Sequence, residues 1–128
     1  MGQRLLEKVK SGLVALINQH DYIEGFAIDG RTAAGYKPGE YVNVDLILAS
    51  YRVLPKDIML VRKDLNRKFQ LLSGGLELHI RLPIAKDRFG STLKRAFDPE
   101  TIYVFRLRET MAKWGPDPSA EIYFADSR

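Results

Sequence analysis

The sequence predicts an α+β domain with a mainly antiparallel sheet and two helices on one face, in the order α-β-β-α-β-β-β. Two segments, 41–49 and 76–82, alternate apolar and polar residues as half-buried strands do. Between them, apolar residues recur at steps of three and four, which is typical of a helix with one buried stripe: Leu54, Ile58, Val61, Leu65, Phe69 and Leu72. Strands and helices that do not alternate strictly favour an α+β arrangement.

The length and composition indicate one folded domain spanning residues 1–128. The chain has no cysteine, which excludes disulfides, thiolate zinc sites and thiol nucleophiles. It contains no apolar run of eighteen residues and no signal-peptide core, so we expect no membrane span. We expect a cytoplasmic protein, or a virion protein if the source is a phage. The net charge of +4 favours anionic partners mildly.

The first elements follow from apolar spacing. Residues 3–18 form an expected amphipathic helix, with Leu5, Val9, Leu13 and Leu16 on one face. Residues 22–28 are expected to form a short strand. The glycine- and proline-containing segment 29–40 is expected to be a loop or a wide hairpin connection.

The central helix has recognisable start and stop signals. Pro55 suits the first turn because the amide hydrogen that it lacks would be unpaired there. The segment Ser73-Gly74-Gly75 provides a stop, since glycine readily takes the left-handed conformation that closes a helix.

The C-terminal third reads as a basic segment, 85–99, followed by two strands. In the strand expected at 100–108, Tyr103 and Phe105 alternate with Arg106 and Arg108. The alternation predicts buried aromatic rings and arginines in solvent. A turn-rich connection at 113–118 and a strand at 121–125 complete the chain.

No catalytic motif or cofactor-binding motif is present. Asp29, Asp45 and Asp57 are isolated in sequence, and neither a G-x-S-x-G elbow nor a Walker A loop occurs. The two histidines, His20 and His79, lie on different expected elements. We therefore expect no metal and no cofactor, and the chain is more readily interpreted as non-enzymatic.

One pattern nevertheless concerns catalysis. The segment Asp29-Gly30-Arg31, followed by Asn43-Val44-Asp45, resembles the small nucleotidyltransferase pattern, in which a Gly-Ser pair precedes D-x-D on the next strand. That family holds Mg²⁺ between paired carboxylates. Here Arg31 stands where the serine would be, and Asn43 stands where the first aspartate would be. The resemblance implies an unusual or degenerate enzyme using Asp29 or Asp45.

Basic side chains predict a second alternative, nucleic-acid or other polyanion binding. They cluster on the central helix and in the segment after the third strand: Arg62, Lys63, Arg67, Lys68, Arg88, Lys94 and Arg95. Two aromatic residues are candidate interface residues. Trp114 is the lone tryptophan, among turn formers, and Tyr36 lies in the 29–40 loop. For Trp114, a ring that covers one end of the core is an equal alternative.

Two further resemblances concern the order of elements and the size of the chain. Residues 5–83 resemble the cytoplasmic domain of cation diffusion facilitators, with Leu78-His79-Ile80-Arg81-Leu82-Pro83 at the histidine-bearing strand, which implies a metal-responsive domain. In its size, and in having an N-terminal helix, long loops and a closing strand, the chain resembles small phage tail-completion and neck proteins. Both resemblances imply self-association or docking. We therefore expect a non-enzymatic module that oligomerises or docks in a larger assembly.

Overall fold

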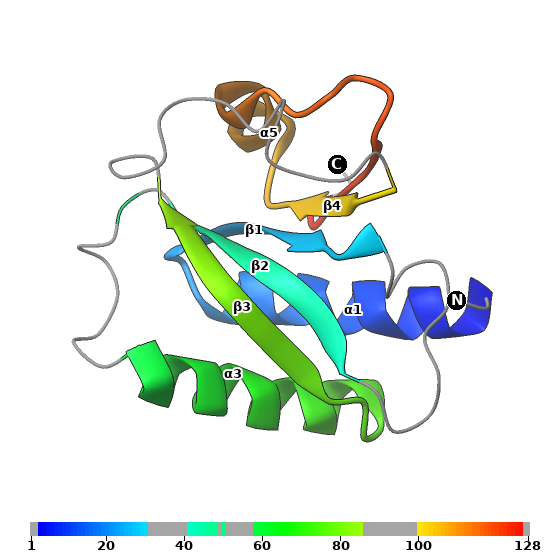
Figure 1. Cartoon of the computed structure of the whole chain (residues 1–128), viewed down its shortest axis with the longest axis vertical. Helices are drawn as coiled ribbons and strands as arrows, with labels where there is room; N and C mark the ends of the chain where they lie inside the picture. The colour runs from blue at the N-terminus through cyan, green and yellow to red at the C-terminus, as the bar shows by residue number, and fades with distance from the viewer. Residues whose placement is uncertain (1–2, 31–40, 49, 51–57, 86–99, 127–128) are drawn as a thin grey trace.

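The computed structural model describes residues 3–30, 41–48, 50, 58–85 and 100–126, and it confirms an α+β fold. The described elements are, in chain order, α1 (Gln3–Gln19), β1 (Ile23–Ile28), β2 (Val42–Leu48), α3 (Ile58–Ser73), β3 (Leu78–Ala85), β4 (Ile102–Phe105), α5 (Arg108–Trp114) and β5 (Glu121–Phe124). The strands form one sheet in the order β3-β2-β1-β4-β5 (Figure 1). No described helix has both the length and the apolar character needed to cross a bilayer.

The sheet is mixed, so the prediction of a mainly antiparallel sheet was wrong. The strand β1 pairs antiparallel with both β2 and β4, whereas β2 pairs with β3, and β4 with β5, in parallel. Each parallel pair is joined by a segment that contains a helix, α3 or α5. A helical crossover returns the chain to the end of the sheet where the previous strand began, so the next strand runs in the same direction.

A helix that the sequence reading missed, α5, also changes the predicted element order. The alternation of 100–108 predicts one long strand, but β4 ends at Phe105 and a helix begins at Arg108. Glu109 in its first turn and Lys113 in its last complement the helix dipole. Gly115 closes the helix with a φ of 54°. The turn formers after Lys113 therefore mark a helix end.

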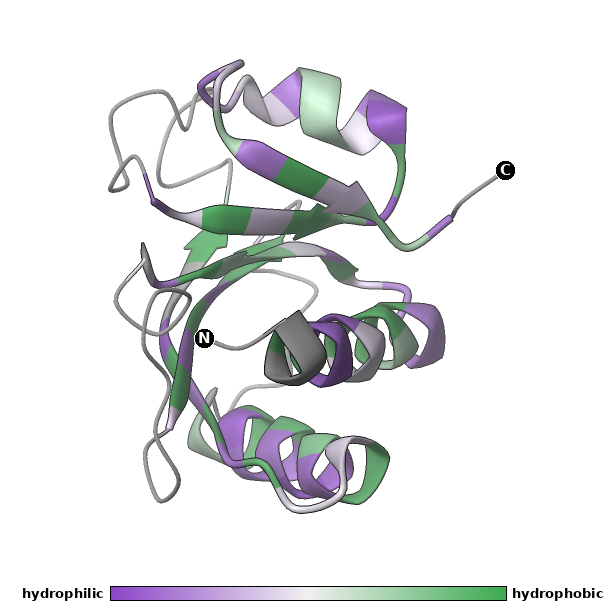
Figure 2. Cartoon of the chain, turned by 90° about the vertical axis from the view of Figure 1, so that its right-hand side faces the viewer, coloured by the Kyte–Doolittle hydropathy of each residue, from purple (hydrophilic) through white to green (hydrophobic). Residues whose placement is uncertain are grey.

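The sheet separates two apolar layers. Helices α1 and α3 cover one face, where Val9, Leu13, Leu65 and Phe69 are completely buried against the strands. Helix α5 covers part of the other face (Figures 1 and 2), and its packing there also departs from the prediction of helices on one face only. That second cluster is smaller and comprises Ala27, Ile47, Ile84, Tyr103, Phe105 and Trp114.

The two large helices approach each other closely at Gly12. A Cβ atom there would lie 2.5 Å from the Phe69 ring, so the glycine that weakens α1 as an isolated helix lets α3 pack against it. The predicted stop of α3 is confirmed, with Gly74 and Gly75 at positive φ and Gly75 N–H donating to the Gln70 carbonyl. The predicted burial of Leu72 was wrong, since 42% of it is exposed.

Candidate functional site

A polar cluster occupies the part of the second sheet face that carries Asp29, Asp45 and Arg81. Asp45 lies on β2 opposite Ala27 of β1, and Asp29 follows the end of β1. On the other side of β2, the pairing with β3 shifts from Val44–Ile80 to Leu46–Pro83. This β-bulge sets Arg81 in the part of β3 that opposes Asp45.

Arg81 joins the two aspartates. Its Nη1 donates to Asp29 Oδ2 at 2.7 Å, and its Nη2 donates to Asp45 Oδ2 at 3.1 Å. The alternation of apolar and polar residues in 41–49 predicts that Asp45 faces solvent, but its side chain is only 8% exposed. A charge at this depth is tolerated when it is paired and hydrogen-bonded. The two carboxylates from the nucleotidyltransferase-like pattern thus lie on the same face, and a guanidinium bridges them.

Neighbouring contacts hold this cluster in place. Arg62 of α3 donates from Nη2 to the Arg81 carbonyl at 2.6 Å, which fastens the bulged strand to the helix. His79 Nδ1 lies 2.9 Å from Asn43 Oδ1 on the adjacent strand. Burial, with Asp117 and Asp45 nearby, raises the pKa of Tyr103 to about 12, so its hydroxyl remains protonated at neutral pH.

The chemistry of the cluster is that of an internal ion-pair network. A two-carboxylate clamp holds a cation between its oxygens, and here the Arg81 guanidinium lies between Asp29 and Asp45. Within the described residues, no three His, Asp or Glu side chains gather as they would to hold a metal ion.

Replacing Arg81 with alanine is expected to lower the free energy of unfolding by about 2 kcal/mol, because it removes the guanidinium that both aspartates contact. Arg67→Ala is the matched control, since it breaks a more exposed pair with Asp64 and should cost less than about 0.5 kcal/mol in dilute protein. Urea unfolding measures both. Equal effects of the two substitutions would contradict the structural role of Arg81.

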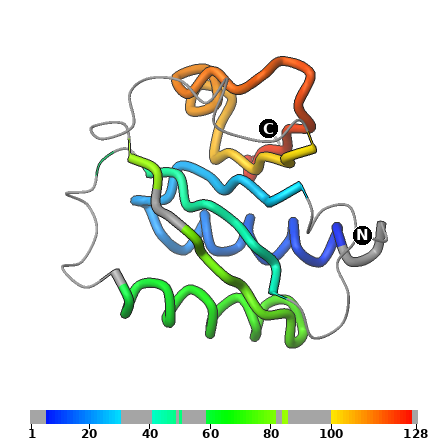
Figure 3. Tube along the Cα trace, viewed as in Figure 1, coloured from blue at the N-terminus to red at the C-terminus, as the bar shows by residue number. Residues whose placement is uncertain are grey.

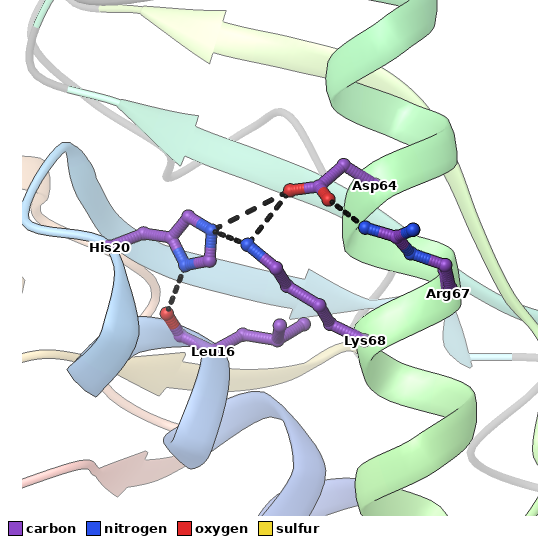
Figure 4. Close-up of polar contacts among 5 residues, drawn as sticks. All are labelled: Leu16, His20, Asp64, Arg67 and Lys68. Atoms are coloured by element: carbon purple, nitrogen blue, oxygen red, sulfur yellow. Dashed lines mark hydrogen bonds and ion pairs between the residues drawn. The ribbon is translucent and has the colours of Figure 1, made fainter.

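A second polar group joins the end of α1 to α3 around His20 (Figure 4). His20 Nδ1 lies 3.2 Å from the Leu16 carbonyl, so this nitrogen carries the hydrogen. Nε2 then accepts a hydrogen bond from Lys68 Nζ at 3.1 Å. Lys68 and Arg67 also contact Asp64, at 2.9 Å and 3.1 Å. The histidine is therefore neutral in this arrangement.

The surroundings of His20 oppose its protonation. Burial lowers the pKa of His20 from its ordinary value of 6.5, and Lys68 and Arg106 lower it further, while Asp64 and Asp21 act in the opposite direction. The hydrogen bond from Lys68 similarly lowers the pKa of Asp64. The group is thus arranged for a neutral imidazole beside a Lys68–Asp64 ion pair.

This arrangement predicts a loss of stability in mild acid. A neutral His20 favours the folded state above pH 6.5, whereas below that pH the unfolded chain binds a proton that the folded chain resists. The stability should fall as the pH drops from 6.5 toward the lowered pKa of the folded state. In His20→Gln this part of the pH dependence should disappear, as measured by urea unfolding at several pH values. His79→Gln is the control, and the same flattening there would argue against His20 as the cause.

Most of the α3 cations that were predicted to bind nucleic acid make contacts within the chain. Arg62 binds the Arg81 carbonyl, and Arg67 and Lys68 pair with Asp64, whereas Lys63 is exposed. The remaining predicted cations, Arg88, Lys94 and Arg95, lie outside the described residues. Nucleic-acid binding therefore stays a prediction, and the contacts of α3 do not favour it.

The outward side of α3 instead shows exposed apolar side chains. Of the six large apolar residues that are exposed in the described part of the chain, four belong to this helix: Met59 (54%), Leu60 (61%), Leu71 (81%) and Leu72 (42%). Of these four, Leu60 and Leu71 project to the same side of α3, and exposed apolar side chains that share a side favour an interaction surface. We refer to Leu60, Asp64, Arg67 and Leu71 as the outer face of α3. The sequence reading missed Leu60 and Leu71, although both fall outside the buried stripe of the helix.

The two predicted interface aromatics are placed differently. Trp114 ends α5 and is completely buried, and its indole N–H donates to Glu24 Oε1 at 3.3 Å. Its ring thus belongs to the core of this chain, which does not favour the interface role predicted for it. Tyr36 lies outside the described residues.

Arg106 and Arg108 also depart from the sequence expectation. Arg106 was expected in solvent, but its guanidinium donates to the backbone carbonyls of Ile17, His20 and Ile23. Arg108 is exposed, with its guanidinium 4.8 Å from the centre of the Phe124 ring. Tyr103 and Phe105 are buried as predicted.

A shallow groove of about 390 Å³ lies between α1 and β5. Val14, Ala15 and Phe124 provide its apolar lining, and Lys10 Nζ lies 3.7 Å from the centre of the Tyr123 ring at its border. The groove contains no cluster of titratable groups that would suggest chemistry.

Comparison with known proteins finds no matching protein family, no matching curated protein and no matching solved structure.

Proposed function

We propose that this protein is a non-enzymatic α+β module that docks in a larger assembly through the outer face of α3. The proposal is carried by one observation, the exposure of Leu60 and Leu71 on a helix whose opposite side is fully packed. Leaving these two side chains in water forgoes about 1.5–3 kcal/mol each of possible burial. A partner surface that covers them would gain much of that free energy.

The polar clusters support the same proposal indirectly. Arg81 bridges Asp29 and Asp45, and Lys68 engages both His20 and Asp64. These side chains therefore contribute to the stability of the fold. Leu60 and Leu71 are different, because among the described residues neither belongs to an apolar cluster of the core.

Light scattering across a range of concentrations, combined with a pull-down from the source organism, tests this proposal. The wild type should self-associate or enrich a partner, and the double variant Leu60→Ser, Leu71→Ser should do neither while it unfolds at nearly the same temperature. Leu107→Ser is a control, since Leu107 is 36% exposed but lies away from α3. Wild type and double variant behaving alike in both measurements would refute docking through α3.

A further inference from the structure

The outer face of α3 has the same spacing of side chains when it is read in the opposite direction, with the positions of the two charges exchanged. Leu60 and Leu71 are eleven residues apart, which is about three helical turns plus 20°, so they project in nearly the same direction. Asp64 lies four residues after Leu60, and Arg67 lies four residues before Leu71. The helix therefore presents leucine, carboxylate, guanidinium and leucine along one side.

We infer that α3 pairs antiparallel with α3 of a second copy of this chain, an inference that rests on the proposed docking function. A two-fold axis passing between positions 65 and 66 sets Leu60 opposite Leu71 of the partner subunit. The same axis sets Asp64 opposite Arg67 of the partner subunit. A two-fold interface repeats every contact, so two leucine contacts flank two carboxylate–guanidinium contacts.

The charges distinguish this arrangement from its parallel alternative. A parallel pair in register would bring Asp64 against Asp64 of the partner subunit, and Arg67 against Arg67 of the partner subunit. Like charges placed together cost free energy, whereas the antiparallel pair sets Asp64 opposite Arg67 of the partner subunit at two places. The order of the charged residues thus selects the direction of the partner helix.

The monomer can exchange its own Arg67–Asp64 contact for the same contact with the partner subunit. The Arg67 side chain is 74% exposed, so its guanidinium can turn toward the partner subunit without leaving a buried position. Asp64 also contacts Lys68 at 2.9 Å, and that contact keeps the carboxylate paired while Arg67 turns away. The helix itself stays anchored to α1 and the sheet through Val61, Leu65 and Phe69.

The size of the contact between the two α3 helices determines how tightly two copies should bind. A helix of 16 residues is about 24 Å long. The contact between two such helices is smaller than the roughly 1,600 Å² that typical stable complexes bury. We therefore expect a dissociation constant in the micromolar range or weaker, with dimers at concentrations of about 0.5 mM or at high local concentration in an assembly.

Cysteine cross-linking tests the geometry, because the chain has no cysteine of its own. Leu60→Cys and Leu71→Cys, prepared with tags of different mass and mixed under mild oxidation, should form the mixed disulfide. Leu60→Cys alone should not cross-link efficiently, since the two positions 60 are about 16 Å apart along the antiparallel pair and a disulfide needs Cα atoms within about 7 Å. Lys8→Cys on α1 reports random collisions. A predominance of Leu60→Cys homodimers, or a mixed disulfide no more frequent than with Lys8→Cys, would overturn the inference.

A charge exchange provides a second readout that does not depend on disulfide chemistry. Leu71→Glu should weaken self-association by at least about tenfold, because it places a charge against Leu60 of the partner subunit. Adding Leu60→Lys should restore part of it, since the introduced lysine then faces the introduced glutamate. Both positions are exposed, so urea unfolding in dilute protein should show little change.

The outcomes separate this inference from the proposed function. If the wild type self-associates and Leu71→Glu abolishes this, but the mixed disulfide fails to form, docking through α3 stands and the antiparallel pairing is wrong. If the wild type stays monomeric at about 0.5 mM, the self-pairing is wrong, and the pull-down of the wild type against the double serine variant decides on docking to another protein.

Discussion

Trp114→Ala is expected to lower the free energy of unfolding by about 3–5 kcal/mol, a large part of the stability of a domain of this size. The indole ring is completely buried between α5 and the second sheet face, where it packs with residues that include Ile47 and Phe105. Removing it leaves a cavity that the neighbouring strands cannot fill without moving. The variant should unfold at a much lower urea concentration, as followed by circular dichroism.

Two further substitutions test whether the loss of the buried ring causes the loss of stability. Trp114→Phe keeps an aromatic ring but loses the N–H donated to Glu24, and we expect a cost of about 1–2 kcal/mol. Leu107→Ala, at the start of α5 and 36% exposed, should cost less than about 1 kcal/mol. If Trp114→Ala instead left the unfolding curve unchanged and altered the mass in solution, Trp114 would be an interface residue and its core role would be wrong.

Arg106→Ala is expected to cost about 3 kcal/mol, the second largest effect. The guanidinium donates from Nη2 to the Ile17 carbonyl at 2.5 Å and to the His20 carbonyl at 2.6 Å, and from Nε to the Ile23 carbonyl at 3.0 Å. The last carbonyls of a helix have no partner within the helix. Without the arginine, the partly buried acceptors between α1 and β1 lose a charged donor.

Arg106→Lys and Arg108→Ala are the controls for this prediction. A lysine retains the charge but cannot reproduce the fork of donors, so it should recover only part of the loss. Arg108 is exposed near Phe124, and its removal should cost about 0.5 kcal/mol. Urea unfolding, together with hydrogen exchange at the end of α1, measures these effects. Similar losses for Arg106→Ala and Arg108→Ala would show that the carbonyl contacts contribute little.

The sequence predicted the elements with strong periodicity and missed those without it. The buried stripe of α3 and the alternation in β2 identified Leu65, Phe69, Val44 and Leu46 as core residues, and all four are completely buried. Helix α5 has seven residues, too few for a helical period to stand out beside the alternation that precedes it. Strand direction also escaped the prediction, because α5 was not recognised and the strand–helix–strand order around α3 was not taken to imply a parallel pair.

The clusters were harder to predict because they join distant positions. Arg81 meets Asp45 through a bulge between β2 and β3, and no local pattern in the sequence marks that irregularity. Arg106 reaches Ile17 across 89 positions of the chain. Periodicity places a side chain on a face, but only the sheet order reveals which residues from other elements share that face.

The central position of β1 has a consequence for synthesis of the chain. Figure 3 shows β1 between β2, which follows soon in the sequence, and β4, which belongs to the C-terminal third. During translation α1, β1, β2, α3 and β3 can emerge and pair before β4 exists. Until Phe105 has left the ribosome, one edge of β1 has no strand to accept its backbone hydrogen bonds. Chains that stall before this point therefore expose an apolar edge, and we expect them to aggregate or to be bound by chaperones.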